Sequence, residues 1–178
     1  MRMADAAFEI RLFDKALHDR RAFSCGVPAM DRWLKESIGD QIATDRLRVW
    51  CARDAAGRLV GFYGLSAHEV RPEHAPALAR RKERHAIPAI YLPALAVDRT
   101  CQGRGLGGAL MAHAIETAIE ASAIIGAAAL VLDVLRDANF ARRKAFYLGI
   151  GFAEIGDEDD ARLFLTMKDA RAEFLAGR

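Results

Sequence analysis

The chain has 178 residues with 52% hydrophobic and 28% charged side chains, which is typical of one water-soluble domain with a buried core. No apolar run approaches the roughly 18 residues that span a bilayer, and the N-terminus lacks a signal-peptide pattern. Three widely spaced cysteines predict reduced thiols, and neither a disulfide framework nor a metal site. We therefore expect a single domain over residues 1–178, cytoplasmic and without membrane contact.

The first part of the chain favours one helix among several strands. Alternating apolar residues predict a strand over residues 8–13, and helical spacing predicts a helix from Pro28 to about residue 38. A turn sequence, Asp-Ala-Ala-Gly, predicts a hairpin between strands at 48–53 and 59–66. The polar segment that follows, up to residue 85, is expected to be a loop or a short irregular helix.

The rest of the chain alternates more regularly between strands and helices. A strand over residues 89–97 must bend or bulge at Pro93, because proline has no N–H for a sheet. Asn139 is expected to cap a later helix. The remaining elements are a helix, a strand, a helix and two strands, over residues 105–123, 127–134, 139–148, 152–155 and 162–167. This order predicts an α/β protein whose mixed sheet is flanked by helices.

A glycine-rich loop between the strand at 89–97 and the next helix is the most informative stretch. Glycines allow several backbone N–H groups to converge, and the start of a helix adds unpaired donors and partial positive charge. Such a loop suits a pyrophosphate, although a glycine-rich turn that merely starts a helix is the plainer alternative. The loop residues are Gln102, Gly103, Arg104, Gly105, Leu106, Gly107 and Gly108.

The spacing of this loop separates it from other phosphate-binding loops. No Lys-Ser or Lys-Thr pair follows the glycines, and the third glycine comes one position too early for a dinucleotide fingerprint. The pattern Gln102-x-x-Gly105-x-Gly107 instead resembles the Q/R-x-x-G-x-G/A signature of the GNAT N-acetyltransferases. A second stretch, Phe146-Tyr147-x-x-x-Gly-Phe, resembles that family's motif near the last helix. The resemblance implies the GNAT fold and acetyl-CoA as acyl donor.

One branch of the family is the most similar. Phe-Ser-Cys-Gly at residues 23–26, followed by Met-Asp-Arg-Trp-Leu at 30–34, resembles the opening of the toxin acetyltransferases of type II toxin–antitoxin systems. Those relatives acetylate the α-amine of aminoacyl-tRNA and so block translation. The resemblance therefore implies aminoacyl-tRNA as substrate and a small ribbon-helix-helix antitoxin as partner, and a homodimer is compatible with it. Cys101 and Gly149 depart from the family pattern.

The resemblance also suggests roles for residues of the site. It assigns Tyr147 as the general acid that protonates the departing thiolate; the alternative is a tyrosine that packs in the core. Main-chain groups of the strand at 89–97, which Pro93 disrupts, are expected to bind the pantetheine arm and the acetyl oxygen. Arg104 and the amides of the glycine-rich loop are expected to bind the pyrophosphate. The strand residues concerned are Leu95, Ala96 and Val97.

No general base stands out, because His68, Glu69 and Asp133 have no supporting spacing. An α-amine with a pKa near 8, lowered further by its neighbouring ester, needs a base less than a lysine does. This favours aminoacyl-tRNA.

An RNA substrate predicts basic residues around the site. Two clusters are candidates, with Arg20 and Arg21 as additions, and an ordinary mixed surface is the alternative. Other functions remain open: a GNAT enzyme acting on a small amine or a protein amine, or a non-catalytic scaffold. The clusters consist of Arg80, Arg81 and Arg84, and of Arg142, Arg143 and Lys144.

Overall fold

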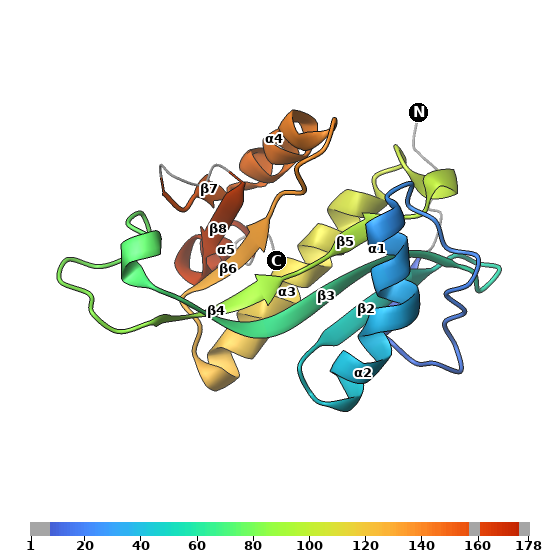
Figure 1. Cartoon of the computed structure of the whole chain (residues 1–178), viewed down its shortest axis with the longest axis horizontal. Helices are drawn as coiled ribbons and strands as arrows, with labels where there is room; N and C mark the ends of the chain where they lie inside the picture. The colour runs from blue at the N-terminus through green and yellow to red at the C-terminus, as the bar shows by residue number, and fades with distance from the viewer. Residues whose placement is uncertain (1–7, 157–160, 175–178) are drawn as a thin grey trace. The chain divides into compact units, whose positions relative to one another are not determined.

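A computed structural model of the chain describes residues 8–156 and 161–174 (Figure 1). The chain divides into two compact units. Unit 1 consists of Met1–Leu65 and Ala94–Ala114, and unit 2 of Ser66–Pro93 and Ile115–Arg178. Strand β3 (Leu59–Val70) and helix α3 (Leu106–Ile125) each begin in unit 1 and end in unit 2.

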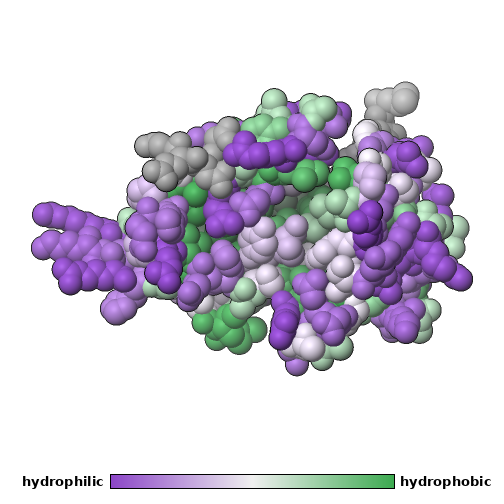
Figure 2. Space-filling view, in the orientation of Figure 1, coloured by the Kyte–Doolittle hydropathy of each residue, from purple (hydrophilic) through white to green (hydrophobic). Residues whose placement is uncertain are grey.

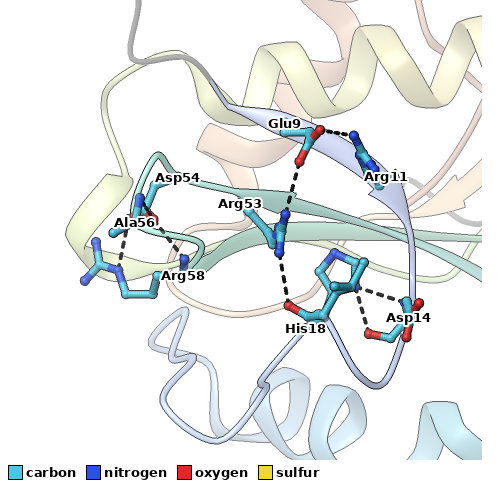
Figure 3. Close-up of polar contacts among 9 residues, drawn as sticks. Glu9, Arg11, Asp14, His18, Arg53, Asp54, Ala56 and Arg58 are labelled. Atoms are coloured by element: carbon cyan, nitrogen blue, oxygen red, sulfur yellow. Dashed lines mark hydrogen bonds and ion pairs between the residues drawn. The ribbon is translucent and has the colours of Figure 1, made fainter.

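The strands of unit 1 are antiparallel throughout. Strand β1 (Glu9–Leu12) pairs with β2 (Arg48–Arg53), β2 pairs with β3, and β3 pairs with β5 (Leu95–Val97). The β2–β3 hairpin forms where expected because the Asp54 carboxylate accepts the N–H groups of Ala56 and Arg58 at 3.1 and 2.9 Å. Figure 3 shows Asp54, Ala56 and Arg58 at this turn.

A helical segment covers the core of unit 1. It consists of α1 (Pro28–Arg32), a wider π-helical stretch η1 (Trp33–Ser37) and α2 (Ile38–Ala43). The apolar residues of this segment pack with those of β2, β3 and β5, and their side chains are buried. The central residues of this core are Phe23, Leu34, Ile38, Val49, Phe62 and Ala96.

The start of α3 lies very close to β3. A Cβ atom placed on Gly61 would be 2.8 Å from Leu110 Cδ1 and 3.4 Å from the carbonyl oxygen of Ala96. Because residue 61 is a glycine, α3 can lie close to β3 and β5, and any side chain at this position would push the helix away. This close approach sets where the first turn of α3 begins relative to β5.

Unit 2 contains the rest of the strands. The part of β3 after Leu65 pairs with β4 (Ile87–Leu92), which runs parallel to β6 (Ala129–Asp133); β8 (Arg162–Thr166) and β7 (Ala153–Glu154) follow as antiparallel neighbours. A core of mostly small and branched residues, Val70, Ala89, Val131 and Phe164 among them, lies on one face. The helices are α4 (Phe140–Ile150) and α5 (Met167–Phe174), and a short 3₁₀ turn η2 spans Pro72–His74.

The expected strands and helices are confirmed, and the differences have local causes. The strand at 89–97 divides at Pro93 into β4 and β5. Asn139 occupies the position before α4, but its side chain makes no capping hydrogen bond; the Asp137 carboxylate accepts the Asn139 N–H instead, at 2.8 Å. Gly149 lies inside α4, and Gly151, with φ +111°, ends it. Helix α5 was not anticipated, and residues 157–160, between the last two predicted strands, lie outside the described residues.

Helix α3, within the described residues, is long and apolar enough to cross a membrane by length and composition alone. Its side chains Leu110, Met111, Ile115 and Ala118 are nevertheless fully buried inside the protein. These buried positions identify α3 as a core helix, for which the same composition is expected.

We predict that Gly61→Ala lowers the free energy of unfolding by about 1–3 kcal/mol, because the added Cβ overlaps Leu110 and presses on the Ala96 carbonyl. Gly39→Ala is the matched control: it lies in α2 with open space around it, so the same change should stabilise by about 0.5–1 kcal/mol. Urea denaturation of both variants measures the difference. Equal effects at the two positions would contradict the close approach described for α3.

Candidate active site

Strand β5 offers main-chain groups at an edge that no other strand occupies within the described residues. The Asp98 N–H donates to the Val60 carbonyl at 2.9 Å, and the Gly64 N–H donates to the Ala94 carbonyl at 3.0 Å. Bonded and non-bonded pairs alternate in an antiparallel ladder, so Ala96 is the β5 residue bonded to β3 between these two. The N–H groups of Leu95 and Val97 therefore point away from β3. They are the main-chain donors that β5 has left for a ligand.

Asp98 fixes the turn that follows β5. Its carboxylate accepts hydrogen bonds from the N–H of Ser24 (3.0 Å), the N–H of Thr100 (3.0 Å) and the Thr100 hydroxyl (2.7 Å). The side chain is buried, which by itself raises the pKa of Asp98, but these hydrogen bonds hold it below its usual value. An ionised carboxylate thus caps the short 3₁₀ turn η3 (Arg99–Cys101) and joins it to the segment before α1.

Gln102 fastens the beginning of the glycine-rich loop. Its side-chain amide nitrogen donates to the carbonyl of Val97 and to the carbonyl of Cys25, each at 2.9 Å. The carbonyl of Val97 points to the same free edge as its N–H, which agrees with the alternation along β5. The Gln102 side chain therefore holds the start of the loop against the end of β5.

The loop then reaches α3 through two residues in the left-handed region. Gly103 has φ +73° and Gly105 has φ +85°, and no atom lies within 4 Å of a Cβ built on either. The first N–H of α3 that is bonded in the helical pattern is that of Ala109, which donates to the carbonyl of Gly105, just before the helix, at 3.1 Å. The three preceding N–H groups have no intrahelical acceptor, as at every helix start. Open space beside glycines and these donors together fit a diphosphate.

The side chains of the loop divide into buried and exposed ones. Leu106 is fully buried in the core and can contribute only its N–H to a ligand. Arg104 is exposed and can reach an anion in the cradle, and the Cβ of a residue at Gly107 would contact Val97 at 3.8 Å. The groups that the loop offers to a ligand are therefore backbone N–H donors and the long, exposed side chain of Arg104.

Tyr147 lies on α4 in unit 2. Its half-buried ring packs edge-on against Phe152, with 5.9 Å between the ring centroids, and against Phe146 at 5.2 Å. Burial raises the pKa of Tyr147, so the phenol keeps its proton at neutral pH. The hydroxyl has no hydrogen-bond partner among the described residues, so packing involves the ring and leaves the proton available.

The residues considered as bases belong to a different arrangement in unit 2. Asp133 accepts two hydrogen bonds from the Arg162 guanidinium at 2.8 Å each, which lower the pKa of the carboxyl, and one from the Tyr91 hydroxyl at 2.9 Å. His68 packs against Tyr91 with 5.1 Å between ring centroids, and burial lowers its pKa. An ion-paired carboxylate is a poor proton acceptor, so Asp133 is better suited to hold Tyr91 and Arg162 in place.

The two predicted basic clusters differ in how their charges are used. Arg80, Arg81 and Arg84 are exposed in the loop before β4. On α4, Arg142 is exposed, but its two neighbours in the cluster form ion pairs, Arg143 with Asp137 and Lys144 with Glu154, each at 2.5 Å. The first cluster therefore presents more unneutralised charge than the second.

Sequence reasoning missed Asp98 as a residue that builds the site. The signal was present locally, because an aspartate two residues before a threonine is a common cap for a turn. Its bond to Ser24, 74 residues earlier in the chain, was not visible without the fold.

The family assignment follows from these features together with sequence comparison. The model of the acetyltransferase (GNAT) domain family matches residues 45–154, which include β2 to β6, the glycine-rich loop, α3 and Tyr147. The chain belongs to the GNAT acetyltransferases. The predicted mixed α/β fold and acetyltransferase class are thereby confirmed.

Individual relatives narrow the resemblance to one branch. A tRNA-acetylating toxin of Mycobacterium tuberculosis is 40% identical over 156 residues, which are 86% of this chain and 89% of the relative. A solved structure of AtaT complexed with acetyl-methionyl-tRNAfMet is 26% identical, has a TM-score of 0.80 and covers 94% of this chain and 99% of its own. A tyrosine-to-phenylalanine variant of AtaT, bound to acetyl-CoA and to the C-terminus of the antitoxin AtaR, is 25% identical with a TM-score of 0.78, covering 94% and 98%.

We predict opposite effects of Gly108→Glu on stability and on binding. A glutamate at the third residue of α3 has open space and favours the helix start, so the protein should be at least as stable as the wild type. The same carboxylate repels an anion in the cradle, so the affinity for acetyl-CoA should fall at least about tenfold.

Calorimetry and thermal unfolding measure the two quantities, and Gly108→Gln is the neutral control of nearly the same size. Undiminished affinity in Gly108→Glu would contradict an anion site at this helix start. An equal loss in both variants would mean that bulk, and not charge, is responsible.

Proposed function

We propose that this chain is an acetyl-CoA-dependent N-acetyltransferase of a toxin–antitoxin pair, which acetylates the α-amine of aminoacyl-tRNA and so blocks translation. The observation that carries the proposal is the cradle at the end of β5. Two left-handed glycines, an open helix start and the free edge of β5 follow one another along the chain in a GNAT enzyme. The tRNA substrate is supported by the tRNA-acetylating relative at 40% identity, which matches nearly the whole chain.

Acetyl-CoA supplies the acetyl group as a thioester. The diphosphate is held by the N–H groups of residues 102–108 together with Arg104, since these donors and this cation meet at the helix start. The N–H groups of Leu95 and Val97 hold the pantetheine arm and the acetyl oxygen, because they point to the free edge of β5. Ala96 contributes only by placing its two neighbours, because its own main chain is bonded to β3.

Tyr147 is proposed as the general acid that gives its proton to the departing thiolate. The chain has three tyrosines. Tyr63 is fully buried and hydrogen-bonded to His113 at 2.7 Å, and the Tyr91 hydroxyl donates to Asp133. Burial and that bond raise the pKa of Tyr91 to about 12, and the Tyr91 proton is already committed to the Asp133 carboxylate. Tyr147, which has the family motif around it and no such partner among the described residues, is the one suited to the role.

No dedicated base is required for this acceptor. The α-amine of an aminoacyl ester has a pKa below the value near 8 of an ordinary α-amine, so much of it is neutral at pH 7. Asp133 is engaged by Arg162 and Tyr91, and burial lowers the pKa of His68, whose ring packs against Tyr91. A lysine side chain, with a pKa near 10.4, would need a base that the described residues do not offer.

The remaining features of the proposal concern the context of the enzyme. The two units together act as a single acetyltransferase domain, since the family model spans parts of both. The protein acts in the cytoplasm, where charged tRNA is present, and is held in check by a small ribbon-helix-helix antitoxin. A homodimer is compatible with this arrangement. The exposed Arg80, Arg81, Arg84 and Arg142 provide most of the positive charge for the RNA, and Arg143 and Lys144, which are ion-paired with Asp137 and Glu154, add less.

Incubation with labelled acetyl-CoA and total charged tRNA tests the function directly. We expect label on the amino acid attached to tRNA, and we expect that raising the salt concentration reduces this labelling steeply because phosphate contacts are screened. Free amino-acid esters should be acetylated with little dependence on salt. Label on proteins or polyamines, with none on charged tRNA, would favour a GNAT enzyme of a different acceptor class.

Tyr147→Phe tests the acid. We expect kcat to fall about 10²- to 10³-fold, while calorimetry shows unchanged binding of acetyl-CoA and thermal unfolding shows an intact fold. Tyr91→Phe serves as the matched control, because it removes a phenol of unit 2 that is bonded to Asp133; its kcat should stay within a few-fold of the wild type. A Tyr147→Phe enzyme with wild-type kcat would remove Tyr147 from the mechanism.

A further inference from the structure

A hollow of about 560 Å³ in unit 1 is lined almost entirely by charged side chains. Its walls come from the segment between β1 and α1 and from η1, at residues that the GNAT motifs do not include. Figure 2 shows strongly hydrophilic residues gathered over α1 and the segment before it. The lining contains four cations and one carboxylate, and consists of Lys15, Ala16, Asp19, Arg20, Arg21 and Lys35.

The carboxylate neutralises only one of the cations. Asp19 is bound by Arg21 through two parallel contacts, Nε to Oδ1 at 3.0 Å and Nη2 to Oδ2 at 2.8 Å. The hydrogen bonds of Arg21 lower the pKa of Asp19 to about 2, so the pair stays ionised at every physiological pH. Lys15, Arg20 and Lys35 then give the lining residues an excess of three positive charges. Outside the lining, the Asp31 carboxylate of α1 lies close enough to Lys35 to interact with its charge. Like charges gathered in one hollow repel each other, and a bound anion relieves this repulsion.

Arg20 is held in position before any ligand arrives. Its Nη1 donates to the carbonyl of Leu34 at 2.8 Å, and its guanidinium lies over the Phe13 ring, 5.2 Å from the ring centroid. A guanidinium fixed in this way loses less conformational entropy on binding than a free side chain does. The other donors of the same planar group match the oxygens of a phosphate.

The segment that carries these cations is itself folded tightly. The N–H groups of Leu17 and His18 donate to the carbonyl of Asp14 at 3.1 and 2.9 Å, and the N–H of Asp14 donates to Nδ1 of the buried His18 at 2.9 Å. Arg53 donates to the carbonyl of Leu17 at 3.4 Å and is paired with Glu9 (Figure 3). These bonds fix the backbone on either side of Lys15, and the hollow is therefore a formed feature of the fold.

The chemistry of the lining favours nucleic-acid phosphate over an acidic peptide. Protein-binding surfaces bury apolar and aromatic side chains at their centre and are depleted in lysine. This hollow has Ala16 as its one apolar lining residue and two lysines beside the fixed arginine. Contacts from lysine and arginine to phosphate, without a base-reading group, position an RNA backbone and do not read its sequence.

We propose that this hollow is a second RNA contact, in which Lys15, Arg20 and Lys35 bind backbone phosphates of the tRNA. The proposal rests on the proposed function, since it names a further part of the same substrate. It also predicts that tRNA binding depends on a surface of unit 1 outside the GNAT motifs. The reacting amino acid lies elsewhere, so the hollow contributes to affinity and to its salt dependence and does not touch the chemical step.

The test compares Lys15→Gln, Lys35→Gln and the double variant with Lys168→Gln. Lys168 is exposed on α5 and lies outside the hollow, so it is the matched loss of one charge. We expect the double variant to lower kcat/KM for charged tRNA about tenfold at low salt, and to make the dependence of log(kcat/KM) on log[salt] shallower by about 2. kcat/KM for an amino-acid methyl ester, which has no phosphate, should change less than about twofold.

Binding of uncharged tRNA, followed by fluorescence titration at several salt concentrations, needs no acetylation and should show the same change in slope. An unchanged slope in both measurements would overturn the proposal while leaving the proposed function intact. Equal losses for charged tRNA and methyl ester would also overturn it, because the lysines would then act on the fold or on acetyl-CoA. A wild-type enzyme that acetylates the ester but not charged tRNA would contradict the proposed function. The titration with uncharged tRNA would still show whether the hollow binds RNA.

Discussion

The buried carboxylate of Asp98 is the interaction on which the site of unit 1 depends. The carboxylate accepts hydrogen bonds from the N–H of Ser24 and from Thr100. The backbone N–H of Asp98 donates to the Val60 carbonyl and so makes the last hydrogen bond between β5 and β3. Removal of a buried, charged acceptor leaves several donors without partners, which is among the more destabilising changes a protein can undergo. The strand edge, the 3₁₀ turn and the glycine loop therefore owe their relative positions to one side chain.

The candidate site consists more of main-chain groups than of side chains. Within residues 95–108 the groups suited to a ligand are mostly N–H donors, and the side chains of Ala96 and Leu106 are buried. Such a site tolerates variation in sequence as long as the glycines and the anchors Asp98 and Gln102 remain. Specificity for the acceptor must then come from other surfaces.

The sequence was sufficient for features that depend on neighbours along the chain. The break at Pro93 and the start of α3 after Gly105 follow from the conformations open to proline and glycine. The predicted end of the next helix at residue 148 came two residues early, because Gly149 stays helical and only Gly151 adopts the left-handed conformation. The anchoring of Gln102 could not be predicted, because its acceptor on Cys25 lies 77 residues earlier. The pairing of Lys144 with Glu154 likewise depends on how β7 lies against α4. A run of basic residues in a sequence is therefore a poor measure of the charge that the surface presents.

Gln102 has a mechanical consequence for the choice of acyl donor. One amide nitrogen joins the loop to the carbonyl of Val97, so the loop proposed for the diphosphate and the strand edge proposed for the thioester end belong to one connected piece of unit 1. The backbone therefore fixes the distance between the proposed diphosphate contact at the loop and the proposed thioester contact at β5. Under the proposed binding mode, an acyl carrier whose arm has another length, or which lacks a diphosphate, does not reach both contacts at once.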